Sequence, residues 1–276
     1  MPSYTRLSLR QKLGREYLRD VEVGQTTGSW GATASLTVWA SNLADLTLSG
    51  EAMYERAWIR MLNAYSSAVP AQDARVASFN VGSGAFHCLV VSGTTFGSGA
   101  GYEIHTLLSP AEKDRCLTNV ANLLFGESEF PINSVYGAHV YSLPTEIVDV
   151  QSVRAFGWPV GSKNEVPINW WKAVTTGSGQ ELRIEPSLAY SDQLLLSAIT
   201  RCSLALADAQ TISLPTDEWI LAGAAAQAYW LLERRGPSQE TAFFKESRRE
   251  LAATFRRLSN RFQPRASRKI QLEDWS

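Results

Sequence analysis

Two long stretches rich in Gly, Ser and Thr, residues 24–108 and 127–213, most constrain how this chain of 276 residues can fold. Short runs within them, such as residues 35–39 and 181–185, alternate between apolar and polar side chains. Alternation with a period of two, between Gly and Ser turns, predicts strands. We therefore expect two strand-rich regions, which could pair as one sandwich or fold separately.

Helical patterns flank and interrupt these regions. In residues 1–23, Leu9, Leu13 and Tyr17 recur four residues apart, which predicts a short N-terminal helix. Residues 51–65 also place aromatic and apolar side chains on one helical face. We therefore interpret this segment as a helix within the first strand-rich region.

A sharper helix signal opens residues 109–126. Ser109 is a capping residue, Pro110 suits the first helical position, and Glu112 stands where a capping box requires an acid. An apolar stripe follows and runs out before Gly126, which predicts the end of the helix there.

Residues 214–262 predict a pair of C-terminal helices. Thr216 can cap the first helix, and acidic residues follow at its positive end. Small residues on this helix would let another helix approach closely: Gly223, Ala224, Ala225 and Ala226. The second helix ends at Pro264 because proline cannot continue it, and residues 263–276 form an extended tail.

Composition excludes several classes of protein. The net charge is −1, so the chain as a whole is not a general binder of nucleic acid or membranes. Cys88, Cys116 and Cys202 make neither a disulfide framework nor a metal-binding pair, which favours buried thiols in a reducing compartment. The first residues lack a signal peptide's apolar core, and no run approaches the ~18 apolar residues of a membrane helix. Only 19% of residues are charged and 10% are aromatic, which indicates that partners cover part of the surface.

Candidate catalytic residues are scattered. His87, His105 and His139 are isolated and lack the spacing of zinc ligands. Ser98 lies in a Gly-rich run that has neither the strand-to-helix junction of a nucleophile elbow nor the pattern of a dinucleotide-binding loop. Cys116 falls on the apolar stripe of its helix, where a thiol is inert. The sequence therefore predicts a protein that is not an enzyme and that holds no metal or cofactor.

A carbohydrate-binding or hydrolytic β-domain is an alternative from a different class. The residues that would serve it are Trp158, Trp170 and Trp171 as sugar platforms and Glu165, Glu181 and Asp192 as acids. Adjacent strand residues point to opposite faces, so at most one of Trp170 and Trp171 can form such a platform. Burial of one in the core and of the other in an interface is the preferred interpretation.

The strongest functional candidate is the basic C-terminus. Residues 245–269 carry nine Lys or Arg against two Glu, a net charge of +7. An amphipathic helix accounts for the charges before Pro264 but not for those in the tail. Because Arg and Trp most often anchor protein interfaces, we expect this segment to dock on another protein. A non-specific contact with DNA phosphates is the other interpretation.

The order of these features resembles the neck, or head–tail connector (adaptor), proteins of tailed bacteriophages. The likeness spans residues 5–270. Four features support it. The first two are the helix of 7–18 before a Gly/Thr-rich β stretch and the sequence Leu-Ser-Pro-Ala-Glu at 108–112, which opens a helix. The third is Tyr-Ser-Leu-Pro at 141–144, followed by β-branched residues and Trp170–Trp171, and the fourth is Leu-Pro-Thr-Asp-Glu-Trp at 214–219, which opens an Ala-rich helix before a final helix and an Arg-rich tail. The large β content departs from these adaptors, which are often smaller and nearly all helical.

The resemblance implies an α+β fold, namely a helical bundle of adaptor type made by the N-terminal, middle and two C-terminal helices, with strand-rich insertions of sandwich or barrel-like form. It implies a structural virion protein of the head–tail neck, assembled in the host cytoplasm. Such adaptors form a ring, commonly twelve-fold, that binds the portal protein and the next neck or tail protein. For this chain it implies portal contact by Arg256, Arg257, Arg261, Arg265, Arg268, Lys269 and Trp275. A tail-side or collar protein of the virion is the structural alternative.

Overall fold

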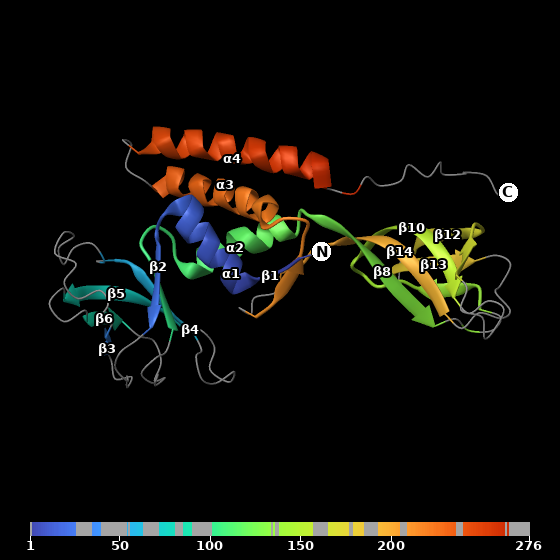
Figure 1. Cartoon of the computed structure of the whole chain (residues 1–276), viewed down its shortest axis with the longest axis horizontal. Helices are drawn as coiled ribbons and strands as arrows, with labels where there is room; N and C mark the ends of the chain where they lie inside the picture. The colour runs from blue at the N-terminus through green and yellow to red at the C-terminus, as the bar shows by residue number, and fades with distance from the viewer. Residues whose placement is uncertain are drawn as a thin grey trace. The chain divides into compact units, whose positions relative to one another are not determined.

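A computed structural model, shown in Figure 1, describes residues 2–25, 35–39, 54, 56–62, 72–80, 85–89, 101–133, 135, 138–156, 165–176, 179–184, 193–204, 209–235, 240–262 and 264. The chain divides into two compact units. Unit 1 comprises Met1–Val120 and Leu204–Arg257, and unit 2 comprises Ala121–Ser203 and Leu258–Ser276. Each unit has a hydrophobic core of its own.

Unit 1 contains a six-stranded antiparallel sheet with the strand order β2-β7-β4-β5-β6-β3. Its strands are β2 (Val21–Gln25), β3 (Ser35–Trp39), β4 (Trp58–Leu62), β5 (Gln72–Asn80), β6 (Ala85–Leu89) and β7 (Gly101–His105). Ile59 on β4 pairs with Ile104 on β7 and with Ala74 on β5, and all three are buried. Nearby, the ring of Tyr54 meets Phe79 and Phe86 edge to face, with centroids 4.9 and 5.3 Å away. These apolar contacts form the core on one face of the sheet.

The predicted N-terminal and middle helices are present in unit 1. Helix α1 (Arg6–Lys12) continues into a π-helical turn, η1 (Leu13–Leu18). Helix α2 (Pro110–Ala121) begins with the predicted capping box. The Ser109 amide donates to Glu112 Oε2 at 2.9 Å, and the Glu112 amide donates to Ser109 Oγ at 3.2 Å. The helix ends at Ala121, before the predicted end at Gly126, and a strand begins at Phe125.

The predicted C-terminal helix pair is also present. Helix α3 (Asp217–Arg235) has the Glu218 amide donating to the Thr216 hydroxyl at 3.3 Å, which confirms the cap. Helix α4 (Thr241–Phe262) lies beside α3 (Figure 1). A short ribbon, β1 (Ser3–Thr5) paired with β15 (Thr211–Ser213), completes the unit.

The small residues of α3 allow the close helix approach that the sequence predicts. A Cβ atom at Gly223 would lie 2.8 Å from Val120 Cγ1 on α2 and 2.9 Å from Phe255 Cδ2 on α4. Real Cβ atoms do not approach so closely, so glycine is required at this point. Ala224 and Ala225 are fully buried, whereas Ala226 is half-buried.

Unit 2 contains two antiparallel sheets that share one core. The four-stranded sheet has the order β11-β10-β14-β8, and the three-stranded sheet has the order β12-β13-β9. Their strands are β8 (Phe125–Asn133), β9 (Val140–Ser142), β10 (Ile147–Phe156), β11 (Glu165–Ile168), β12 (Trp171–Thr176), β13 (Gly179–Ile184) and β14 (Gln193–Arg201). Leu194 and Leu196 of the first sheet pack in one cluster with Leu182 and Ile184 of the second. Two facing sheets with alternating inward side chains form a sandwich.

The predicted fold class is wrong. Among the described residues, four α-helices accompany fifteen strands, and no helical bundle of adaptor type is present. The Gly/Ser/Thr-rich stretches, expected to be insertions, supply the large sheets of both units. Within the segment 51–65, β4 replaces the expected helix because its residues pair with β5 and β7. Aromatic side chains every three or four residues suit a buried strand as well as a helix.

We predict that Gly223→Val lowers the free energy of unfolding of the α3 segment by about 1–3 kcal/mol, because the added atoms overlap Val120 and Phe255. Native-state hydrogen exchange of the α3 amides measures this effect. The matched control is Ala226→Val on the same helix, for which β-branching alone costs about 0.5 kcal/mol. Equal losses at the two positions would contradict close packing at Gly223.

Candidate functional site

The candidate interface is the exposed, basic side of α4. Arg256, Arg257 and Arg261 are exposed on its C-terminal half. That half, residues 251–262, contains no Asp or Glu. Earlier on the helix, Arg248 is already engaged, since its Nε lies 3.2 Å from Glu233 Oε2 on α3. The structure therefore brings together three of the predicted partner-binding residues on a half of α4 that contains no acidic residue.

The opposite side of α4 is apolar and holds the helix in place. Phe244 and Leu258 are buried, and the ring of Phe255 lies against Gly223 of α3. The apolar periodicity in the sequence predicts this face. Anchoring on one side leaves Arg256 and Arg257 exposed on the other side, while the exposed Arg261 guanidinium lies 5.0 Å from the ring centroid of Phe262. The four remaining residues predicted to bind the portal lie outside the described residues: Arg265, Arg268, Lys269 and Trp275.

Two exposed aromatic side chains near the α3–α4 connection, Trp230 and Phe243, were not predicted from the sequence. Trp230 is 39% exposed, and the Arg234 guanidinium stacks 4.2 Å from its ring centroid. Phe243 is 62% exposed and meets the Tyr229 ring edge to face at 6.2 Å. The contact between Trp230 and Arg234 could have been predicted from the sequence, because side chains at positions i and i+4 of a helix share a face. Such stacked Trp–Arg pairs are common at protein interfaces.

A buried ionic network lies elsewhere in unit 1, between its helices and its sheet. Arg10 of α1 binds Glu103 of β7, with Nε 2.8 Å from Oε2, and places Nη1 3.0 Å from Asp114 Oδ1 on α2. Arg60 of β4 donates to Asp114 Oδ2 at 2.7 Å and forms a second ion pair with Asp73 of β5. Two arginines, one from α1 and one from β4, thus share one carboxylate of α2.

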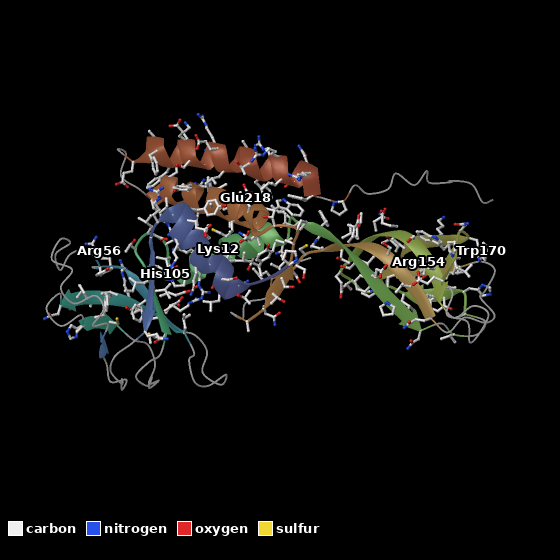
Figure 2. All side chains as sticks on the ribbon, viewed as in Figure 1. Lys12, Arg56, His105, Arg154, Trp170 and Glu218 are labelled. Atoms are coloured by element: carbon white, nitrogen blue, oxygen red, sulfur yellow. The ribbon has the colours of Figure 1, made fainter. Side chains whose placement is uncertain are left out.

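The network continues through Lys113 of α2. Its ammonium donates to Asp20 Oδ1 at 2.5 Å and to Nδ1 of His105, on β7, at 2.9 Å. The imidazole Nε2 lies 3.2 Å from Glu103 Oε2, which closes a ring of contacts back to Arg10. Asp20 also accepts the backbone amide of Leu108, just before α2, at 3.4 Å. His105 is fully buried in unit 1 and is labelled in Figure 2, below Lys12 and Glu218 in that view.

The pKa shifts and the burial of these residues indicate that the network stabilises unit 1 and is not a reaction centre. Burial raises the pKa of Glu103, but the hydrogen bond from His105 and the charge of Arg10 outweigh it and lower the pKa to about 2. Burial lowers the pKa of both His105 and Lys113. Because His105, Glu103, Lys113 and Arg10 are each 0% exposed, no substrate can reach them. Sequence reasoning missed the network, although Arg10 and Lys113 share helical spacing with buried leucines.

The cysteines are inert in the geometry observed. Burial raises the pKa of Cys88 to about 12 and that of Cys116 to about 11. Burial also raises the pKa of Cys202. A thiol in this range carries almost no thiolate at neutral pH, so it is a poor nucleophile. Within the described ranges, His, Cys, Asp and Glu side chains form no group of three that could hold a metal ion.

The residues of the carbohydrate alternative are dispersed in unit 2. Glu165 of β11 is bound by Arg154, and Glu181 of β13 has Arg183 Nη2 at 3.2 Å. The two acids belong to different sheets of the sandwich, and each is paired with an arginine. Trp171 packs on the core of unit 2, whereas Trp170 is 42% exposed (Figure 2). Trp158 and Asp192 lie outside the described residues.

Comparison with known proteins leaves the chain without an assigned family. No known protein family matches the sequence, and no curated protein resembles it significantly. Among the helices in the described ranges, none is both long and apolar enough to cross a membrane.

We predict that Arg10→Met lowers the free energy of unfolding of unit 1 by about 3–5 kcal/mol, because it removes the arginine bound to buried Glu103 and one of the two arginines bound to buried Asp114. Exchange of the most protected amides of β7 measures the loss. The control is Arg115→Met, which removes an exposed arginine from α2 and should change stability by less than about 0.5 kcal/mol. Similar effects for the two variants would show that the network contributes little.

Proposed function

We propose that this protein is a structural protein of a tailed-phage virion, a head–tail adaptor that assembles as a ring between the portal protein and the next neck or tail component. The proposal rests on the resemblance in sequence order and on one structural observation. The C-terminal half of α4 presents Arg256, Arg257 and Arg261 to solvent without an acidic residue in that half. This surface leads directly into the basic tail.

The charged side chains in the C-terminal half of α4 are all of one sign. Its 22 residues carry six basic and two acidic side chains, and both acids, Glu246 and Glu250, lie in the N-terminal half. A helix that served only to cover α3 would gain from mixed charges at i and i+4 on its outer side. One-signed charge instead favours encounter with a surface of opposite charge. In the proposed complex, arginines of α4 steer docking on the portal and the tail completes the contact.

Native mass spectrometry of the full chain mixed with the portal ring of the same virus tests the proposal. We predict that many copies bind one ring. Charge reversal by R256E, R257E and R261E together should weaken binding by roughly 100-fold, because three arginines at an interface change from attractive to repulsive. A chain that ends at Gln263 should bind more weakly as well.

A matched control separates this surface from net charge. Reversal of Arg15, Arg115 and Lys172 to Glu changes the charge by the same amount at exposed positions outside α4. We expect this variant to bind the portal nearly as well as the natural sequence. Equal loss in both triple variants would contradict a specific role for α4. Absence of binding by the natural chain would contradict portal docking and favour a tail-side or collar position.

A further inference from the structure

His105 is a buried histidine with hydrogen bonds at both ring nitrogens. Lys113 Nζ lies 2.9 Å from Nδ1, and Glu103 Oε2 lies 3.2 Å from Nε2. A lysine ammonium can only donate, so Nδ1 accepts. The ionised Glu103 carboxylate can only accept, so Nε2 carries the proton. The two neighbours therefore assign His105 to the neutral Nε2–H tautomer.

The charged groups around the His105 ring either oppose protonation of Nδ1 or already bind another charged group. Glu103 Oε2 also accepts from Arg10 of α1, which satisfies part of its negative charge. Asp20, before β2, is bound to Lys113. On the neighbouring strand β4, Trp58 pairs with His105, and the charged Arg60 is directed to Asp114 and Asp73. The cation nearest to Nδ1 is thus Lys113, and among the described residues no carboxylate forms a hydrogen bond with that nitrogen.

Protonation of Nδ1 would break the contact with Lys113. The added hydrogen removes the only lone pair that accepts from the ammonium, and it places two cations about 3 Å apart in a buried site. One proton from solvent joins Nδ1, the hydrogen bond from Lys113 is lost, and no covalent bond changes elsewhere. The ammonium must then move away from β7, while its bond to Asp20 can persist.

We propose that His105 is an acid-sensitive latch, which holds Lys113 of α2 against β7 when neutral and makes opening of α2 easier when protonated, although Asp114 still joins α2 to Arg10 and Arg60. Release matters beyond α2 because that helix packs against its neighbours through specific contacts. Val120 of α2 lies against Gly223 of α3, and Glu112 of α2 forms an ion pair with Arg235 of α3. Loosening of α2 therefore reaches α3, on which α4 rests. The latch does not depend on what α4 binds.

The expected size of the effect follows from proton linkage. The pKa of His105 is lowered in the folded state by burial, so the stability from the neutral ring is present above pH 6.5 and is lost as the pH falls below it. If the released histidine has its ordinary pKa of about 6.5, the equilibrium constant for opening rises about tenfold between pH 7.5 and pH 5.5. Ordinary carboxyl groups stay ionised over this interval, since their pKa values are about 4.

Hydrogen exchange of the α2 amides in the full chain, corrected for intrinsic exchange rates, tests the latch. We expect protection to fall about tenfold from pH 7.5 to pH 5.5. His105→Gln keeps a donor and an acceptor but cannot titrate, so its protection should not change with pH. The matched control, His87→Gln, replaces an exposed histidine of β6 and should retain the full response.

Three results would overturn the latch. They are a pH response that persists in His105→Gln, a natural chain whose α2 protection does not change with pH, and a His105 ring that nitrogen NMR shows as the Nδ1–H tautomer at pH 7.5. Ring NMR of the natural chain does not need the variant, so it decides the matter even if His105→Gln fails to fold. A neutral Nε2–H ring whose pKa lies below 6.5, with the tenfold change in protection, supports the latch.

Discussion

Unit 1 depends on the carboxylate of Asp114, which two buried arginines share. Arg10 reaches it from α1 and Arg60 reaches it from β4, so a helix and a strand far apart in sequence are fixed to α2 by one side chain. Such a site is costly to assemble, because each charge must leave water before its partner is in place. Once formed, it permits little variation in how α1, α2 and the sheet are arranged, since displacement of any member would strand a buried charge.

Local chemistry explains which parts of the fold could be predicted. The capping box at Ser109 and Glu112 and the cap at Thr216 are hydrogen bonds within one turn, so the sequence contains both partners. The close packing at Gly223 could also be predicted, because a small residue on an otherwise apolar helix indicates that another element packs closely there. The exposed arginines of α4 also followed from periodicity. Each of these features can be predicted from the residues of a single helix, although the neighbours that Gly223 contacts are distant in sequence.

The features that escaped prediction are those that depend on pairing between distant segments. Residues 58–62 have aromatic spacing compatible with a helix, and only their pairing with β5 and β7 makes them a strand. The buried network is non-local too: Arg10 and Glu103 are 93 residues apart. The adaptor-type bundle was what the resemblance to phage adaptors implied, but that resemblance does not determine whether the intervening β stretches are insertions or the main framework. Here they form the framework.

The buried charges of the network and the exposed charges of α4 have opposite roles, and α2 and α3 connect them. Buried charges are compensated at short range, so they contribute to the arrangement of the core and are insensitive to salt. The arginines at the end of α4 are exposed and uncompensated, so their energy is realised only with a partner and weakens with ionic strength. Because α4 rests on α3 at Gly223 and α3 rests on α2 at the same point, the geometry of the exposed surface is set by the helix that the buried network holds.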